Sequence, residues 1–152
     1  MYDIYDDELK EMYESKEEAG VTLDQGISPN DPISSLRQEK FIVLNEHATL
    51  REAINNIQKH HIGCILLENE KKITGIFTER DIVQNIVGKR HNLENECIAN
   101  YMTKSPDVLH MQDPIAFALN KMVSGGYRHI PIVDKMAQPI GVIAMQNIIN
   151  HL

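Results

Sequence analysis

The feature that most constrains this 152-residue chain is an internal repeat. Residues 49–57 align with residues 114–122 at a spacing of 65, and both copies are apolar at positions i, i+3, i+4 and i+7. That pattern places one apolar stripe on a helical face, so it predicts two equivalent helices packed on a core. Pro114 suits the first helical position, with Asp113 as the N-cap before it.

The segments that flank the two helices repeat as well. They predict a short strand before each helix, a strand after it, and a glycine-led strand that runs into a second helix. The paired segments are 41–44 with 106–109, 62–67 with 127–132, and 75–83 with 141–149. One such unit is too small to bury much surface alone, so we expect the two units to fold around a shared core.

We place the repeats at residues 33–97 and 98–152, with an acidic segment and a linker at residues 1–32. Residues 1–20 hold eight acidic and two basic residues, and therefore −6 of the net charge of −7. Such runs are usually solvated. The alternative is that an apolar helical stripe docks on the repeats or on a neighbouring chain; its residues are Tyr5, Leu9, Met12 and Tyr13.

Charge and cysteine content exclude several protein classes. An acidic chain without a Lys/Arg-rich run argues against binding to nucleic acid by phosphate neutralisation. The N-terminus lacks the basic and apolar pattern of a signal peptide, and no apolar stretch is long enough to span a bilayer. Cys64 and Cys97 lie 33 residues apart, which indicates neither a disulfide framework nor a zinc site. We therefore expect a cytoplasmic protein that binds no nucleic acid and no membrane.

Candidate chemistry is concentrated in residues 75–81, where a predicted strand runs into a helix. Thr78 takes a capping position and Asp81 follows three residues later, so a hydroxyl and a carboxylate project together at the helix start. Two interpretations stay open. The pair only caps the helix, or Asp81 also accepts hydrogen bonds from a ligand diol such as ribose hydroxyls.

With this turn in place, the repeated segments resemble a pair of cystathionine-β-synthase-type (CBS) domains, the Bateman module. The resemblance covers residues 33–152, and its sharpest motifs are residues 75–81 and 127–134. It implies an α/β fold of two β-α-β-β-α repeats related by pseudo-twofold symmetry. It also implies a disc-like homodimer, and adenosine-containing ligands bound in clefts between the repeats.

The resemblance further implies that each cleft is crossed, because the Thr-x-x-Asp turn of one repeat faces the leading segment and the middle strand of the other. Asp81 would hold the ribose hydroxyls and Thr78 would add a hydrogen bond. Three side chains would sandwich the base and two would meet a phosphate. These are Ile76, Met102 and Tyr127 for the base and Arg128 and His129 for the phosphate, with Asp107 completing the set. Tyr127 has the alternative of a core aromatic without a ligand role.

The equivalent positions of the other cleft depart from this pattern. Ala144 replaces Thr78 and Asn147 replaces Asp81, while the facing strand has Ile62, Gly63 and Cys64 in place of Tyr127, Arg128 and His129. Loss of a charge-assisted hydrogen bond costs about 1.5–3 kcal/mol, roughly ten- to a hundredfold in affinity. We therefore expect one competent site per chain and a second cleft that is empty or weak.

No pattern indicates catalysis or a metal. His60 and His61 are adjacent, so on a helix they diverge by about 100°, and no activated nucleophile or phosphate-cradling glycine loop is present. We expect a stand-alone regulatory module, not an enzyme, that needs no cofactor and binds AMP, ADP or ATP as a ligand. It would act as a homodimer on an unknown effector protein. The alternative is a purely structural dimerisation or interaction module without a nucleotide.

Overall fold

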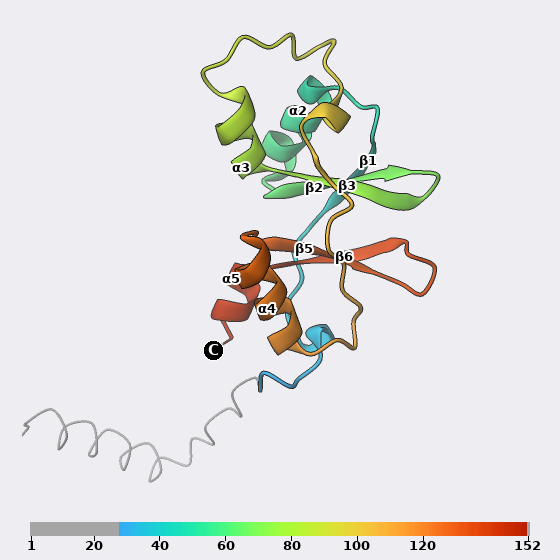
Figure 1. The fold of residues 1–152 in the computed structure, drawn as a ribbon, viewed down its shortest axis with the longest axis vertical. Helices are drawn as coiled ribbons and strands as arrows, with labels where there is room; N and C mark the ends of the chain where they lie inside the picture. The colour runs from blue at the N-terminus through green and yellow to red at the C-terminus, as the bar shows by residue number, and fades with distance from the viewer. Residues whose placement is uncertain (1–27, 152) are drawn as a thin grey trace, which may run out of the picture.

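The structure is a computed structural model that describes residues 28–151, and these residues form two similar halves (Figure 1). The first half comprises residues 41–105 and the second comprises residues 28–40 and 106–151. The first contains β1 (Ile42–Asn45), α2 (Leu50–His60), β2 (Cys64–Asn69), β3 (Lys72–Thr78), α3 (Glu79–Asp81), the π-helix η2 (Ile82–Ile86), the 3₁₀-helix η3 (Ile98–Asn100) and β4 (Thr103–Lys104). The second contains the 3₁₀-helix η1 (Ile33–Ser35), α4 (Ile115–Gly125), β5 (His129–Val133), β6 (Pro139–Ala144) and α5 (Met145–Ile149).

Strand pairing follows the repeat residue by residue. In the first half β1 pairs parallel with β2, β2 antiparallel with β3, and β3 antiparallel with β4. In the second half β5 pairs antiparallel with β6. The parallel pair Leu44–Leu67 recurs 65 residues later as the bridge between Leu109 and Ile132. The predicted α/β fold of two repeats is confirmed.

The two long helices lie where the periodicity predicts them. Leu50, Ala53 and Ile57 of α2 are buried, as are their equivalents in α4, which are Ile115, Ala118 and Met122. Thr49 caps α2, because its hydroxyl accepts a hydrogen bond from the backbone N–H of Glu52 at 3.2 Å. Each helix therefore presents one apolar face to the core of its own half.

Two details of the second repeat were predicted wrongly. The helix α4 begins at Ile115 with Pro114 as its N-cap, and Asp113 does not cap it. The Asp113 carboxylate instead accepts a hydrogen bond from the backbone N–H of His110 at 2.8 Å, in the preceding turn. Residues 106–109 form only the bridge at Leu109, in part because Pro106 has no N–H to donate to a strand ladder.

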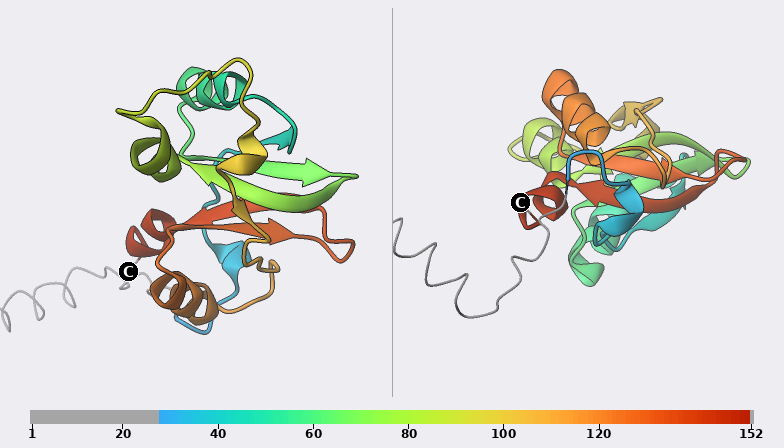
Figure 2. Two further views of the ribbon diagram at one scale, coloured as in Figure 1. Left: turned by 45° about the horizontal axis from the view of Figure 1, so that its top comes forward. Right: turned by 90° about the horizontal axis from the view of Figure 1, so that it is seen from below.

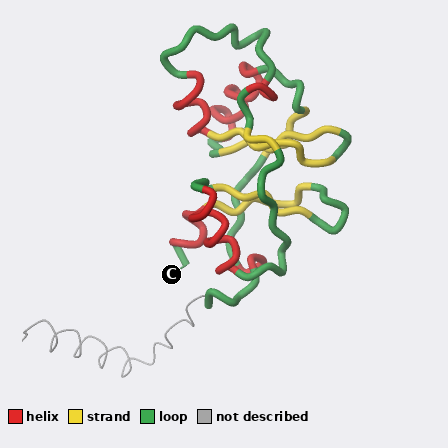
Figure 3. Tube along the Cα trace, in the orientation of Figure 1, coloured by secondary structure: helices red, strands yellow, loops and turns green. Residues whose placement is uncertain are grey.

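The two sheets pack face to face, with the helices outside them (Figures 2 and 3). Their contact is apolar and is formed by Cys64, Leu66, Ile76 and Val142, with Phe41, Val43 and Ile73 at its edge. The halves therefore share a core, as expected for repeats of this size. The predicted stripe from Tyr5 to Tyr13 lies outside the described residues. Among the helices of residues 28–151, none has the length and apolar character needed to cross a membrane.

Candidate functional site

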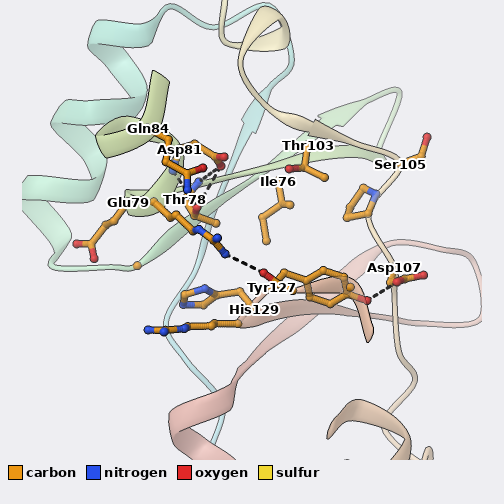
Figure 4. Close-up of a pocket in the computed structure, with 16 residues that line it drawn as sticks. Ile76, Thr78, Glu79, Asp81, Gln84, Thr103, Ser105, Asp107, Tyr127 and His129 are labelled. Carbon is orange, nitrogen blue, oxygen red and sulfur yellow. Dashed lines mark hydrogen bonds between the residues drawn. The ribbon is translucent and has the colours of Figure 1, made fainter. Parts of the chain in front are cut away.

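A cleft of about 890 Å³ opens between the two halves, where β3 runs into α3 and where α4 leads into β5 (Figure 4). Its walls come from both repeats. Seven of the eight predicted ligand residues line it: Ile76, Thr78, Asp81, Asp107, Tyr127, Arg128 and His129. The structure thus brings together side chains that are up to 53 positions apart in the sequence.

The Thr78–Asp81 turn is a capping box. One carboxylate oxygen of Asp81, Oδ2, accepts hydrogen bonds from the Thr78 backbone N–H at 2.8 Å and from the Thr78 hydroxyl at 3.0 Å. The Asp81 backbone N–H in turn approaches the Thr78 hydroxyl at 3.3 Å. The capping interpretation is therefore confirmed. Oδ1 of Asp81 has no hydrogen-bond partner among residues 28–151, so capping leaves half of this carboxylate free in the cleft wall.

Asp107 holds Tyr127 in place at the opposite wall (Figure 4). The Tyr127 hydroxyl donates a hydrogen bond to Oδ2 of Asp107, and the Lys121 ammonium donates one to Oδ1 at 3.3 Å. The Tyr127 hydrogen bond, then Lys121, lower the pKa of Asp107. Burial and the hydrogen bond to Asp107 raise the pKa of Tyr127 to about 12. Asp107 thus fixes a ring in the cleft wall, and both of its oxygens are engaged.

His129 lies closely over the backbone of the other half. A Cβ at Gly63 would be 2.9 Å from Nε2 of His129, so a larger residue at this position would require the imidazole to shift. Burial lowers the pKa of His129, which outweighs the opposing effects of Glu39 and Glu79. A lowered pKa keeps the imidazole uncharged at pH 7, so His129 offers the cleft a neutral N–H and Arg128 supplies the positive charge.

Met102 does not line the cleft. It packs into the core of the first half, and a Cβ at Gly75 would overlap its thioether. The wall is formed instead by the residues that follow, Thr103, Ser105 and Pro106. The family resemblance indicated this segment of the chain, but it did not indicate which of the segment's side chains face the cleft.

Three further side chains of the cleft, besides three glycines, were not predicted: Glu79, Arg80 and Gln84. Glu79 and Arg80 lie inside the Thr-x-x-Asp turn. Their position at a predicted strand-to-helix junction could have indicated from the sequence that they line the cleft. Arg80 donates a hydrogen bond through Nη1 to the backbone carbonyl of Gly126 at 2.8 Å.

The equivalent turn of the second repeat keeps the cap but not the carboxylate. The side-chain carbonyl of Asn147 accepts a hydrogen bond from the Ala144 N–H at 2.7 Å, and its amide donates to Oε1 of Glu39 at 2.6 Å. The side chain of Asn147 is buried. Nearby, burial and then Glu39 raise the pKa of the Cys64 thiol to about 12, so it stays protonated. At this turn, both the carbonyl and the NH₂ group of the Asn147 side chain are therefore hydrogen-bonded to other residues of the chain.

Within residues 28–151, no three His, Cys, Asp or Glu side chains gather in a metal-binding arrangement.

The CBS domain family model matches this chain twice, at residues 33–88 and 98–152. A CBS domain-containing protein of Arabidopsis thaliana is 33% identical over 118 residues, which are 76% of this chain and 21% of that protein. An uncharacterized protein of Methanopyrus kandleri is 35% identical over 103 residues, 66% of this chain and 52% of that one. The chain thus spans about a fifth of the length of the Arabidopsis protein.

Solved structures share the arrangement of the two repeats. A CBS domain protein from Pyrobaculum aerophilum, solved in complex with AMP, superimposes with a TM-score of 0.69 at 28% identity, covering 76% of this chain and 88% of that one. The CBS domain pair of protein MJ0100, solved with 5′-methylthioadenosine and S-adenosyl-L-methionine, has a TM-score of 0.67 at 21% identity, covering 78% and 97%.

Proposed function

Because this chain belongs to the CBS domain family, we propose that it is a regulatory module that binds an adenine nucleotide of the AMP, ADP or ATP class in the cleft between its halves. The observation that carries the proposal is the cleft itself. It combines a half-free carboxylate at Asp81, a fixed ring at Tyr127 and a cationic Arg128. The AMP complex of the similar Pyrobaculum protein supports the same ligand class.

Each part of a nucleotide has a complementary group in the cleft. Oδ1 of Asp81 accepts hydrogen bonds from the ribose hydroxyls, and Thr78 lies beside it. Ile76 and Tyr127 offer apolar surface to the base, while Arg128 attracts phosphate with the N–H of His129 beside it. In this proposal Asp107 acts through Tyr127, because its two oxygens are already hydrogen-bonded.

The proposal includes assembly into a homodimer that acts on an effector protein and carries out no catalysis of its own. Exposed apolar side chains support a contact with another chain. Val83 on η2 is 67% exposed and Val123 on α4 is 74% exposed. The same residues favour the second candidate function, a structural interaction module without a nucleotide.

Asp81→Asn tests the function with the cap preserved. Asn147 shows that an amide caps the equivalent turn, so this substitution removes the charge of Asp81 while keeping the helix start. We expect calorimetry with AMP, ADP, ATP and S-adenosylmethionine to give one ligand per wild-type chain. We expect the variant to bind roughly ten- to a hundredfold more weakly.

Glu70→Gln is the matched control, because it removes one negative charge from the exposed β2–β3 turn, far from the cleft. Its affinity is expected to equal that of the wild type. If none of the four compounds binds the wild type, the interaction module replaces the sensor. Two equal sites per chain would contradict the assignment of the second turn.

A further inference from the structure

A single hydrogen bond joins the two halves of the molecule. Among the hydrogen bonds and ion pairs of residues 28–151, only the one from Arg80 to the Gly126 carbonyl connects the first half with the second. The other contacts between the described parts of the halves are close packing, of apolar side chains such as Leu66 and Val142 and of the His129 ring over Gly63. Apolar packing is non-directional, so this bond is the one polar contact that fixes a particular pair of atoms across the cleft.

The carbonyl that Arg80 contacts belongs to a junction that positions the cleft wall. Gly126 ends α4 in a left-handed conformation, with φ at 69°, and its N–H donates to the Met122 carbonyl at 2.9 Å. The next residue is Tyr127, whose hydroxyl is tied to Asp107, and Arg128 follows it. The Gly126 carbonyl thus directly precedes two residues that line the cleft.

Arg80 is also suited to bind an anion. It is exposed, it lines the cleft, and it forms no ion pair with an acidic side chain of the described residues. A guanidinium has five N–H donors, and Arg80 uses one of them on a neutral carbonyl. A phosphate offers charge and paired oxygens, which make a stronger partner for arginine than a carbonyl does. A phosphate in this cleft would thus compete with Gly126 for Arg80.

We propose that Arg80 is a ligand-displaceable latch, which ties the halves together through Gly126 and is drawn away by the phosphate of a bound nucleotide. This inference rests on the proposed function and adds how binding is converted into a change between the halves. An uncharged nucleoside lacks the phosphate and leaves the latch closed. A nucleotide can shift the equilibrium between the latched and unlatched arrangements only by the difference in its binding free energy for the two.

The ligand arm of the test compares Arg80→Gln with Arg90→Gln, a change of the same kind at an exposed arginine that does not line the cleft. Affinities for AMP and adenosine are measured by calorimetry. We expect Arg80→Gln to weaken AMP roughly ten- to a hundredfold and to leave adenosine within about twofold of the wild type. An equal loss for both ligands, or no loss for AMP, overturns the proposal.

The second arm needs no ligand. Spin labels at Lys72→Cys and Lys135→Cys, in a Cys97→Ser background, report the distance between the hairpins of the two halves. We expect Arg80→Gln to broaden the distance distribution and Arg90→Gln to leave it unchanged. An unchanged distribution in Arg80→Gln overturns the latch. If the wild type binds no adenine compound, displacement by a nucleotide falls with the proposed function, while the labels still decide whether Arg80 joins the halves.

Discussion

Tyr127 and Asp107 show how one pair of residues both shapes the cleft wall and makes it sensitive to pH. The pKa of Tyr127 rises from 10.0 to about 12, first through burial and then through Asp107. A raised folded-state pKa means that the protonated hydroxyl stabilises the fold below pH 10, and that this stabilisation is lost as the pH rises through about 12. The pKa of Asp107 is lowered, so its contribution is present above the usual range of aspartate and is lost in acid.

A difference titration of tyrosine absorbance, wild type minus Tyr127→Phe, isolates this group from the other tyrosines. We expect ionisation near pH 12 in the wild type. In an Asp107→Asn background, the pKa of Tyr127 from the same difference titration should fall toward the ordinary value of 10.0 without reaching it. Burial, the larger cause of the shift, remains in that variant. Ionisation of Tyr127 near pH 10 in the wild type would show that the hydroxyl is free in solution.

At the scale of elements, the repeat predicted the helices and strands because their positions depend on backbone periodicity. Leu50, Ala53 and Ile57 define the buried face of α2 from spacing alone. Details set by individual side chains could not be predicted in this way. Met102 turns into the core because Gly75 leaves room for its thioether, and Asp113 bonds back to its own turn. The contact of Arg80 with Gly126 depends on the final placement of both halves.

The loop between η2 and η3, residues 87–97, is fixed to the rest of the first half through Glu96. Its carboxylate accepts hydrogen bonds from the Tyr101 hydroxyl and from the Asn92 N–H at 2.8 Å, and it pairs with His91 at 2.9 Å. The Tyr101 bond, then His91, then the Asn92 N–H lower the pKa of Glu96. This fixation is therefore present above the usual range of glutamate and is lost as the pH falls below it.

Glu96→Gln is expected to speed amide hydrogen exchange within residues 91–97 at neutral pH, because the neutral amide replaces a carboxylate that three donors share. Glu94→Gln is the control, since Glu94 forms only an exposed ion pair with Arg51. Because the pKa of Glu96 is lowered, only a pH well below the usual range of glutamate should bring the wild type close to the variant. Equal exchange in both variants at neutral pH would refute this account of the loop.

At the scale of the whole molecule, the apolar contact between the two sheets makes the halves depend on each other. Leu66 is fully buried in that contact, beside Cys64, Ile76 and Val142. Loss of its side chain would leave a cavity shared by both halves. The fold should therefore unfold as one unit, with the ligand cleft and its supporting core lost together.

Leu66→Ala is expected to lower the free energy of unfolding by about 2–5 kcal/mol while keeping a single transition. Urea unfolding followed by circular dichroism, and by hydrogen exchange of α2 and α4 separately, measures both properties. Met136→Ala, at a position in the β5–β6 turn that is 73% exposed, should change stability by less than about 0.5 kcal/mol. Separate midpoints for α2 and α4 would show that the halves fold independently.

The hairpins of the two halves differ in length without disturbing the strands that they join. Equivalent residues lie 65 positions apart at Cys64 and His129 but 66 apart at Thr78 and Ala144, and both ladders shift register at the same place. The extra residue is thus absorbed at the turn, at the opposite end of the strands from α3 and α5 (Figure 1). A module built this way has two points where sequence can be inserted, or another domain grafted, while the geometry of the cleft stays unchanged.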